Sequence, residues 1–218
     1  MKNLTNYIVF HDQKSFDLFQ INNPDIDTSI YNYIHVGTMM NFKPLHEMLL
    51  KNGFDVICES DYNLNLRFYT SLLTFTVWYL IAKNNICSTD FVGIFEYDVK
   101  FSREIDIELK ENTIYGINKR PLPDSMFLKS LPLLNHLMNF DEKKIKYWNS
   151  SSNFIMPMEF LKKFVDWYME IVPNILPEKS HPHYHERCVN IFAANNGYSN
   201  ETIEGIEHLQ LNSHGINL

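Results

Sequence analysis

The sequence predicts a single α/β domain, residues 1–218, in which a mostly parallel sheet is flanked by helices. Short apolar runs typical of strands alternate along the chain with segments of helical periodicity, and this alternation favours a parallel sheet. A length of 218 residues suits one domain. Apolar residues make up 45% of the chain and charged residues 21%, a composition that supports one sizeable core and excludes wholesale disorder.

The first part of the chain begins this alternation. Apolar runs at 6–10 and 31–36, each ended by polar residues or glycine, predict two strands with a polar helix or loop between them. Apolar side chains at helical spacing over 43–52, followed by Gly53, predict a helix with a glycine cap. Residues 54–58 predict the third strand.

The middle of the chain continues in the same way. A long apolar pattern over 66–84 predicts a buried helix. Its most apolar stretch, 72–82, is too short to span a bilayer, which needs about 20 residues. The unbroken apolar run 91–95 predicts a buried strand, 112–117 predicts a further strand, and 126–139 predicts a helix.

Two more helices are predicted in the last third. A polar loop and a short strand lead to Pro157, which stands where a first helical proline belongs, with apolar residues at helical spacing behind it. We expect Pro173 and Pro177 to end that helix, because proline lacks the amide that a helix interior needs. A final helix is predicted over 187–195, and a polar tail follows it.

Charge and cysteine content exclude several classes of protein. With 19 basic and 26 acidic residues the net charge is −7, which argues against a nucleic-acid-binding surface. Cys58, Cys87 and Cys188 form no close pair, so a disulfide framework or a zinc ribbon has no support. The N-terminus lacks a signal-peptide core. We therefore expect a cytoplasmic protein without a membrane span.

The sequence Glu96-Tyr97-Asp98 follows the most apolar predicted strand directly. In open α/β sheets the ligand crevice lies at the carboxyl ends of the strands. Two carboxylates at i and i+2 of extended chain point to the same side, so they can hold one Mg²⁺ or Mn²⁺ against a diphosphate. The alternative is that both are solvated or paired with Lys100 and Arg103.

A histidine run, His181, His183 and His185, precedes Glu186 at the predicted start of the last helix. Its spacing does not match the i, i+4 pattern of helical zinc sites, so surface histidines are the plainer interpretation. If the carboxylate of Glu186, at a helix N-terminus, faces a crevice, it could act as a general base on a sugar hydroxyl. The alternative is that Glu186 only stabilises the helix end.

The segment from Trp148 and Asn149 to Asn153 is rich in amide and hydroxyl groups. Such groups suit carbohydrate, whose hydroxyls need neutral donors and acceptors and whose apolar face stacks on an indole. The alternative is a plain turn with Trp148 in the core. The chain contains no phosphate-binding glycine loop, no dinucleotide-binding glycine motif and no serine-hydrolase elbow.

In the order of its motifs the chain resembles the small GT-A-type glycosyltransferases of the capsular-polysaccharide kind, which occur in bacteria and large DNA viruses. The resemblance runs from about Asp61 to Gly197 and depends on four segments: a helix at 63–84, the strand 90–101, Asn153-Phe154-Ile155-Met156-Pro157 before Trp167, and His185-Glu186-Arg187 before the last helix.

The resemblance implies a GT-A-like (Rossmann-like) sheet and a Mn²⁺ or Mg²⁺ ion as cofactor. Glu96 and Asp98 stand in the place of the family's D-x-D metal motif, and because Glu96 departs from the motif, Asp98 is the safer ligand. Enzymes of this type often add a late histidine as a third ligand, for which His214 is the first candidate and His208 the second.

The resemblance also implies which residues contact the donor and the acceptor. Glu186 takes the place of the acidic residue that faces the acceptor. His11 and Asp12 would lie near the nucleotide base, and Tyr97 and His185 are expected substrate contacts without a more precise role. Further expected contacts to the sugar or acceptor are Trp148, Asn149 and Asn153.

The expected function is metal-assisted transfer of a sugar from a nucleotide diphosphate sugar, UDP-linked by preference, to a glycan or glycoconjugate acceptor. This would serve polysaccharide biosynthesis in a bacterium or, for a viral protein, in the host cytoplasm. One alternative is a degenerate protein that binds carbohydrate without catalysis, and another is a metal-dependent phosphoesterase or nuclease. The donor sugar, the acceptor, the linkage, inversion or retention, and the oligomeric state stay open.

Overall fold

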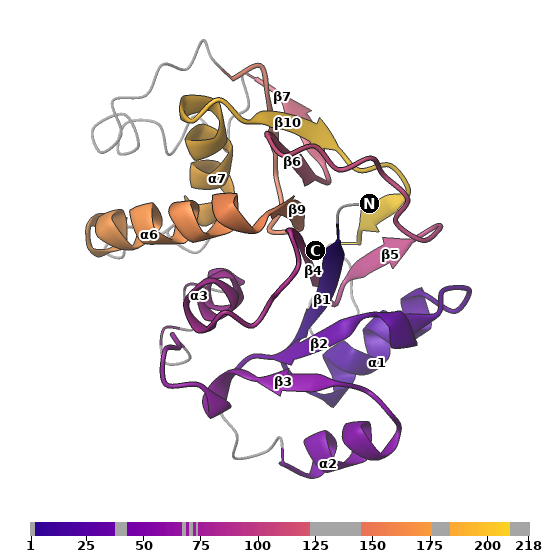
Figure 1. Ribbon diagram of the computed structural model, residues 1–218. Coiled ribbons are helices and arrows are strands. Elements are labelled where there is room, and N and C mark those ends of the chain that lie inside the picture. The colour runs from indigo at the N-terminus through magenta and orange to yellow at the C-terminus, as the bar shows by residue number, and fades with distance from the viewer. Residues whose placement is uncertain are drawn as a thin grey trace.

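The computed structural model describes residues 3–37, 43–66, 69, 72, 74–122, 145–175 and 184–209. Its centre is a seven-stranded sheet in the order β10-β6-β9-β4-β1-β2-β3 (Figure 1). The strands are β1 (Leu4–Phe10), β2 (Asn32–His35), β3 (Val56–Cys58), β4 (Phe91–Glu96), β6 (Thr113–Gly116), β9 (Phe154–Pro157) and β10 (Ser199–Thr202).

The sheet is mostly parallel, as the alternation of strands and helices predicts. β1 pairs in parallel with both β2 and β4, β2 with β3, and β10 with β6. β9 is antiparallel to its neighbours β4 and β6. The carboxyl ends of the other strands, and the start of β9, therefore lie at one edge of the sheet, which we call the carboxyl edge.

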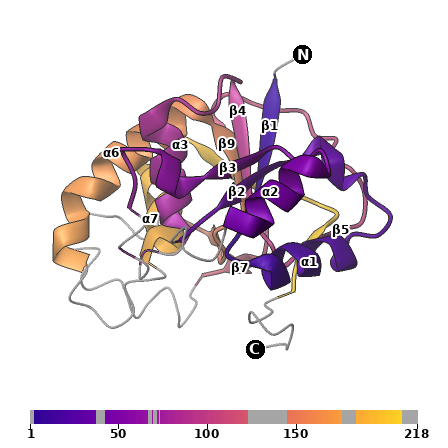
Figure 2. The same cartoon turned by 90° about the horizontal axis from the view of Figure 1, so that it is seen from below.

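Helices cover both faces of the sheet (Figures 1 and 2). One face packs α3 (Phe75–Asn84), α6 (Met158–Ile175) and α7 (Tyr184–Asn195), and the other packs α1 (Gln13–Asn22) and α2 (Lys43–Lys51). β1 shows why two cores form: Tyr7 and Val9 belong to the first cluster, whereas Ile8 and Phe10 belong to the second.

Two small sheets extend the carboxyl edge. β5 (Val99–Phe101) pairs with β11 (Ile206–His208), and β7 (Lys119–Pro121) pairs with β8 (Tyr147–Asn149), both antiparallel. The sequence predicts only a polar tail after residue 195, and the structure places β10 and β11 in it. Their sequences, Ser-Asn-Glu-Thr and Ile-Glu-His, carry little of the apolar signal of a strand, and backbone pairing places them there.

The predicted helix at 66–84 begins only at Phe75. Before it, the amides of Tyr69 and Leu72 bond carbonyls three residues back, a tighter turn than the α-helix. Leu66 and Leu72 are nevertheless buried. The apolar pattern therefore predicted the burial of these residues correctly, but it predicted the α-helical backbone only from Phe75 onward. The other predicted strands and helices within the described ranges are present, with ends that shift by one to three residues.

Two proline predictions also change. Pro157 is the last residue of β9 and directly precedes α6, and Pro173 lies inside α6, which continues to Ile175. Ile175 is fully buried, so core packing supports the last helical turn although Pro173 removes one backbone hydrogen bond. Pro177 and the predicted helix at 126–139 lie outside the described residues. Within the described ranges, no helix combines the length and apolarity that crossing a membrane requires.

Candidate metal centre

Glu96 ends β4, and the chain then turns through Tyr97 and Asp98 into β5. The five β4 residues before Glu96 are all buried, so the first polar side chains come where the chain leaves the sheet. Side-chain exposure is 24% for Glu96 and 7% for Asp98. Two largely buried carboxylates thus lie together at the carboxyl edge, as the sequence predicts.

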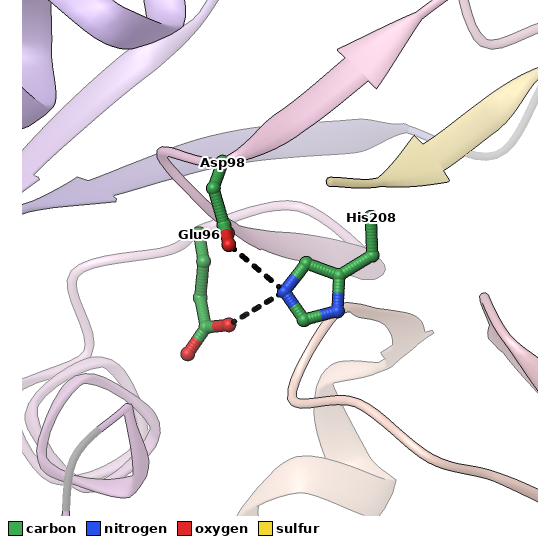
Figure 3. A group of neighbouring side chains, drawn as sticks. All are labelled: Glu96, Asp98 and His208. Atoms are coloured by element: carbon green, nitrogen blue, oxygen red, sulfur yellow. Dashed lines mark ion pairs between the residues drawn. The ribbon is translucent and has the colours of Figure 1, made fainter. Parts of the chain in front are cut away.

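His208 of β11 joins this pair from the far end of the chain. Its Nε2 lies 3.2 Å from Asp98 Oδ2 and 3.6 Å from Glu96 Oε2 (Figure 3). β11 is held in register on β5, with His208 opposite Val99, and the amide of Leu209 donates to the carbonyl of Asp98 at 2.9 Å. Potential ligand atoms of Glu96, Asp98 and His208 lie within 4.8 Å of one another, so these residues could hold a metal ion.

The electrostatics of the cluster favour a cation. Burial and the charge of Asp98 raise the pKa of Glu96 to about 7. Burial alone would lower the pKa of His208, but the hydrogen bond to Asp98 and the charges of Asp98 and Glu96 outweigh it and raise that pKa. Two neighbouring carboxylates repel each other and are stabilised by positive charge between them; their oxygens are ligands that Mn²⁺ and Mg²⁺ accept, and the added imidazole nitrogen favours Mn²⁺ of the two. The residues present therefore fit the expected cofactor.

Glu96 is fixed by two residues that come from other elements. The amide of Glu96 donates to Asn153 Oδ1 at 2.6 Å, and Asn153 is fully buried at the start of β9. The Thr74 hydroxyl, directly before α3, donates to Glu96 Oε1. Asn153, which the sequence predicts as a sugar contact, therefore supports the candidate metal centre through the backbone of Glu96.

Glu186 lies in the first turn of α7 and is half-buried. Ser152 Oγ donates to its Oε1 at 3.2 Å and lies 2.9 Å from His185 Nε2. The charge of Glu186 contributes to the raised pKa of both Glu96 and His208, so it acts on the same space.

His185 supports Glu186 from the core. It is 1% exposed, and its ring contacts those of Phe75 and Trp78 at 6.3 and 5.6 Å between centroids. It therefore fixes Ser152, which in turn donates to Glu186, and its ring is enclosed by the core.

His11 and Tyr97 lie side by side next to the carboxylates. Their rings meet edge to face, 5.7 Å between centroids. Burial, followed by the charges of Asp98 and Glu96, raises the pKa of Tyr97 to about 12, so the hydroxyl stays protonated. Asp12 instead caps α1 and accepts from the amide of Ser15 at 2.8 Å, which gives its carboxylate a structural task.

Two of the predicted sugar contacts are structural in this fold. Trp148 is 1% exposed within the core, so its ring has no face for a sugar. Asn149, also 1% exposed, takes part in an amide network with Asn190 and Asn200 that joins β8, α7 and β10. The interpretation that Trp148 belongs to the core is thus the correct one.

Some predicted residues lie outside the described ranges. These include His214, the first candidate for the third ligand, and also His181 and His183. The second candidate, His208, is the one found at the carboxylates. Of the cations that could have paired with the acids, Arg103 lies 3.9 Å from Glu204. Sequence reasoning gave Thr74 no role and included Ser152 only as part of a hydroxyl-rich segment, because the partner of a hydroxyl is not known before its neighbours in space are known.

A cavity of about 450 Å³ opens at the opposite, amino edge of the sheet. It is lined by Thr89, Asp90, Phe91, Glu111, Asn112, Pro157, Met158, Glu159 and Tyr198. None of the metal-centre residues contributes to it. Its acidic side chains are exposed, whereas those of the metal centre are mostly buried.

Comparison with known proteins rests on structure alone, since no protein-family model and no curated protein matches the sequence. The bifunctional glycosyltransferase WbbM aligns with 94% of this chain at 12% identity and a TM-score of 0.58. The chain spans 45% of that protein.

Two other solved structures align less closely. Glucosyl-3-phosphoglycerate synthase from Mycobacterium tuberculosis, solved with Mn²⁺, UDP and glucosyl-3-phosphoglycerate, covers 95% of this chain and is itself covered to 72%, at 8% identity and a TM-score of 0.49. The galactosyltransferase LgtC, solved with donor and acceptor sugar analogues, covers 90% and is covered to 72%, at 13% identity and a TM-score of 0.48. The fold of this chain is that of the GT-A-type glycosyltransferases.

Proposed function

We propose that this protein transfers a glycosyl group from a nucleoside diphosphate sugar, UDP-linked, to a hydroxyl of a glycan or glycoconjugate acceptor. The observation that carries this proposal is the convergence of Glu96, Asp98 and His208 at the carboxyl edge of a GT-A-type sheet. That edge is where open α/β sheets bind their ligands. Polysaccharide synthesis, cytoplasmic location and bacterial or viral origin are predictions that follow from the resemblance.

Asp98 Oδ2, Glu96 Oε2 and His208 Nε2 would hold Mn²⁺ or Mg²⁺. Bound there, the cation would supply positive charge against the diphosphate as it leaves. Asn153 and Thr74 keep Glu96 in place. His11 and Tyr97, which adjoin the carboxylates, would line the donor side.

Glu186 would act on the acceptor. In an inverting transfer the acceptor oxygen forms the new bond to the anomeric carbon, the bond from that carbon to the diphosphate oxygen breaks, and Glu186 takes the hydroxyl proton. Ser152 donates to Oε1 and so fixes the carboxylate for this task. In a retaining transfer Glu186 would bind the acceptor hydroxyl without taking its proton.

The test is a thermal-shift and calorimetric screen of UDP-, GDP- and dTDP-sugars with and without Mn²⁺. We expect one nucleotide class, UDP, to raise the melting temperature only when Mn²⁺ is present. Asp98→Asn should abolish the shift, and the matched control Asp90→Asn, at the amino edge, should keep it.

The screen, extended to free sugars, and a separate assay on a bare phosphodiester distinguish the alternatives. Binding of free sugars without dependence on a cation would support a carbohydrate-binding protein. Turnover of a bare phosphodiester would support a phosphoesterase. No shift with any nucleotide would overturn the transferase proposal.

A further inference from the structure

Asn118 lies in the loop between β6 and β7 and touches the metal centre through His208. Its Nδ2 is 3.2 Å from His208 Nδ1, on the side of the ring opposite the carboxylates. Its backbone has φ +58°, in the left-handed region that asparagine tolerates better than most residues. The amide and the hydroxyl of Ser150 both donate to its carbonyl, at 3.3 and 3.2 Å.

The chemistry of this contact constrains the ring. With the amide nitrogen towards the ring, Nδ1 of His208 accepts, and in the neutral ring the proton is then on Nε2, which faces Asp98; a ring that carries both protons would need Oδ1 of Asn118 there instead. A cation at the carboxylates needs the lone pair of Nε2. The proton must then be on Nδ1, and Nδ1 needs an acceptor.

We propose that Asn118 is the positioning residue of His208 and serves both neutral tautomers of the ring. Its amide presents Nδ2 to Nδ1 when Nε2 carries the proton, and it turns over to present Oδ1 when Nε2 binds the cation. The proton on Nε2 leaves to solvent and one from solvent arrives at Nδ1, so the ring stays neutral. The second state rests on the proposed function, because it requires the cation.

Asparagine suits this task because its side chain ends in both a donor and an acceptor. The Ser150 contacts hold the backbone of Asn118, so the terminal amide can rotate without a shift of the loop. His208 is on a strand of only three residues, and a second contact to its ring therefore matters for where Nε2 points.

Two variants separate positioning from packing. Asn118→Gly removes the amide and keeps the left-handed backbone, which glycine adopts without strain. Asn118→Asp has nearly the same shape but can only accept. The matched control is Asn85→Gly, because Asn85 also has a positive φ, +51°, and its side chain bonds Lys162 away from the site.

The first measurement uses metal-free protein at alkaline pH, where the His208 ring is neutral. The ¹⁵N resonances of the imidazole should report the Nε2–H form in the wild type and in Asn85→Gly. They should report the Nδ1–H form in Asn118→Asp. The same form in the wild type and in Asn118→Asp would overturn the proposal.

The second measurement is the affinity for Mn²⁺ alone. Asn118→Gly should bind between about tenfold and a hundredfold more weakly than the wild type, as is usual when the partner of a ligating histidine is lost. Asn118→Asp should bind at least as tightly as the wild type. An unchanged affinity in Asn118→Gly would overturn the proposal. A wild type that binds no Mn²⁺ would overturn the cation site and the cation-bound state, while the metal-free measurement would still decide the Asn118 contact.

Discussion

Acidic side chains lie at both edges of the central sheet, but they are exposed at the amino edge and largely buried at the carboxyl edge. At the amino edge, Asp90, Glu111 and Glu159 surround an open cavity and are exposed. At the carboxyl edge, Glu96 and Asp98 are largely buried and converge on one imidazole. Within the described ranges, only the carboxyl-edge group brings ligand atoms close enough for a metal ion.

The comparison shows that a candidate metal site requires acidic side chains that are buried and that converge on one point. The number of acidic residues at an edge does not create such a site. Water solvates the exposed carboxylates and screens them from one another. At the carboxyl edge, burial removes that water and, together with the charge of Asp98, raises the pKa of Glu96 to about 7. A cation bound between the two carboxylates would therefore stabilise their charged forms. Buried polar groups such as His35, Asn153 and His185 also lie at this edge.

The largest effect is expected at Glu186, when it is compared with Glu159, another glutamate in the first turn of a helix. For an inverting transfer, Glu186→Gln in α7 should lower kcat at least about a hundredfold, because the amide takes no proton. Glu159→Gln, in the first turn of α6, should leave kcat unchanged, since Glu159 is exposed and pairs with Lys163. Steady-state kinetics with the donor found in the screen measures both. An equal loss in the two variants would remove the distinction between the edges.

Acid should weaken the fold through the carboxyl edge. Burial lowers the pKa of His35 to about 4, and the ring lies 3.0 Å from the carbonyl of His11. Between about pH 6.5 and 4 the unfolded chain binds a proton that the folded chain excludes, so stability rises with pH in this window and is lost as pH falls. The contribution is about 3 kcal/mol. Urea unfolding of wild type and His35→Gln at several pH values should show a flatter pH dependence in the variant, and parallel curves would contradict this.

A smaller loss is expected when the support of Glu96 is removed. Asn153→Ala takes the acceptor from the Glu96 amide inside the protein and should cost about 2 kcal/mol of unfolding free energy. Asn112→Ala, an exposed asparagine at the amino edge, should stay within about 0.5 kcal/mol of the wild type. Chemical denaturation compares the two. Similar losses of unfolding free energy in the two variants would mean that burial of the asparagine does not determine its contribution to stability.

No effect on cation binding is expected from the amino-edge acids. Replacing Asp90 and Glu111 together by Asn and Gln should leave the Mn²⁺ affinity unchanged, because their exposed carboxylates do not converge with a histidine. Calorimetric titration with Mn²⁺ tests this. Weaker binding in the double variant would place a second cation site at the open cavity.

The local sequence predicted the structure correctly where all the residues that form a feature are contiguous in the chain. The apolar run of β4 and the two carboxylates behind it are contiguous, so the strand, its exit and the candidate ligands could all be predicted together. It was a weaker guide where partners are distant. Trp148 beside amides suggested a sugar platform, but its ring fills the core, because an indole buries more apolar area there than any solvent-facing position offers.

By itself, the sequence determined the alternation of strands and helices, the mostly parallel sheet and the position of Glu96 and Asp98 at a strand end, because these follow from local periodicity and chain order. The tertiary structure alone decided that His208, 110 residues after Asp98, meets that pair. It also decided that Asn118 backs its ring and that Asn153 bonds Glu96. Such contacts depend on how β11 and β9 pair with distant strands, and backbone pairing leaves little mark on the side chains that it brings together.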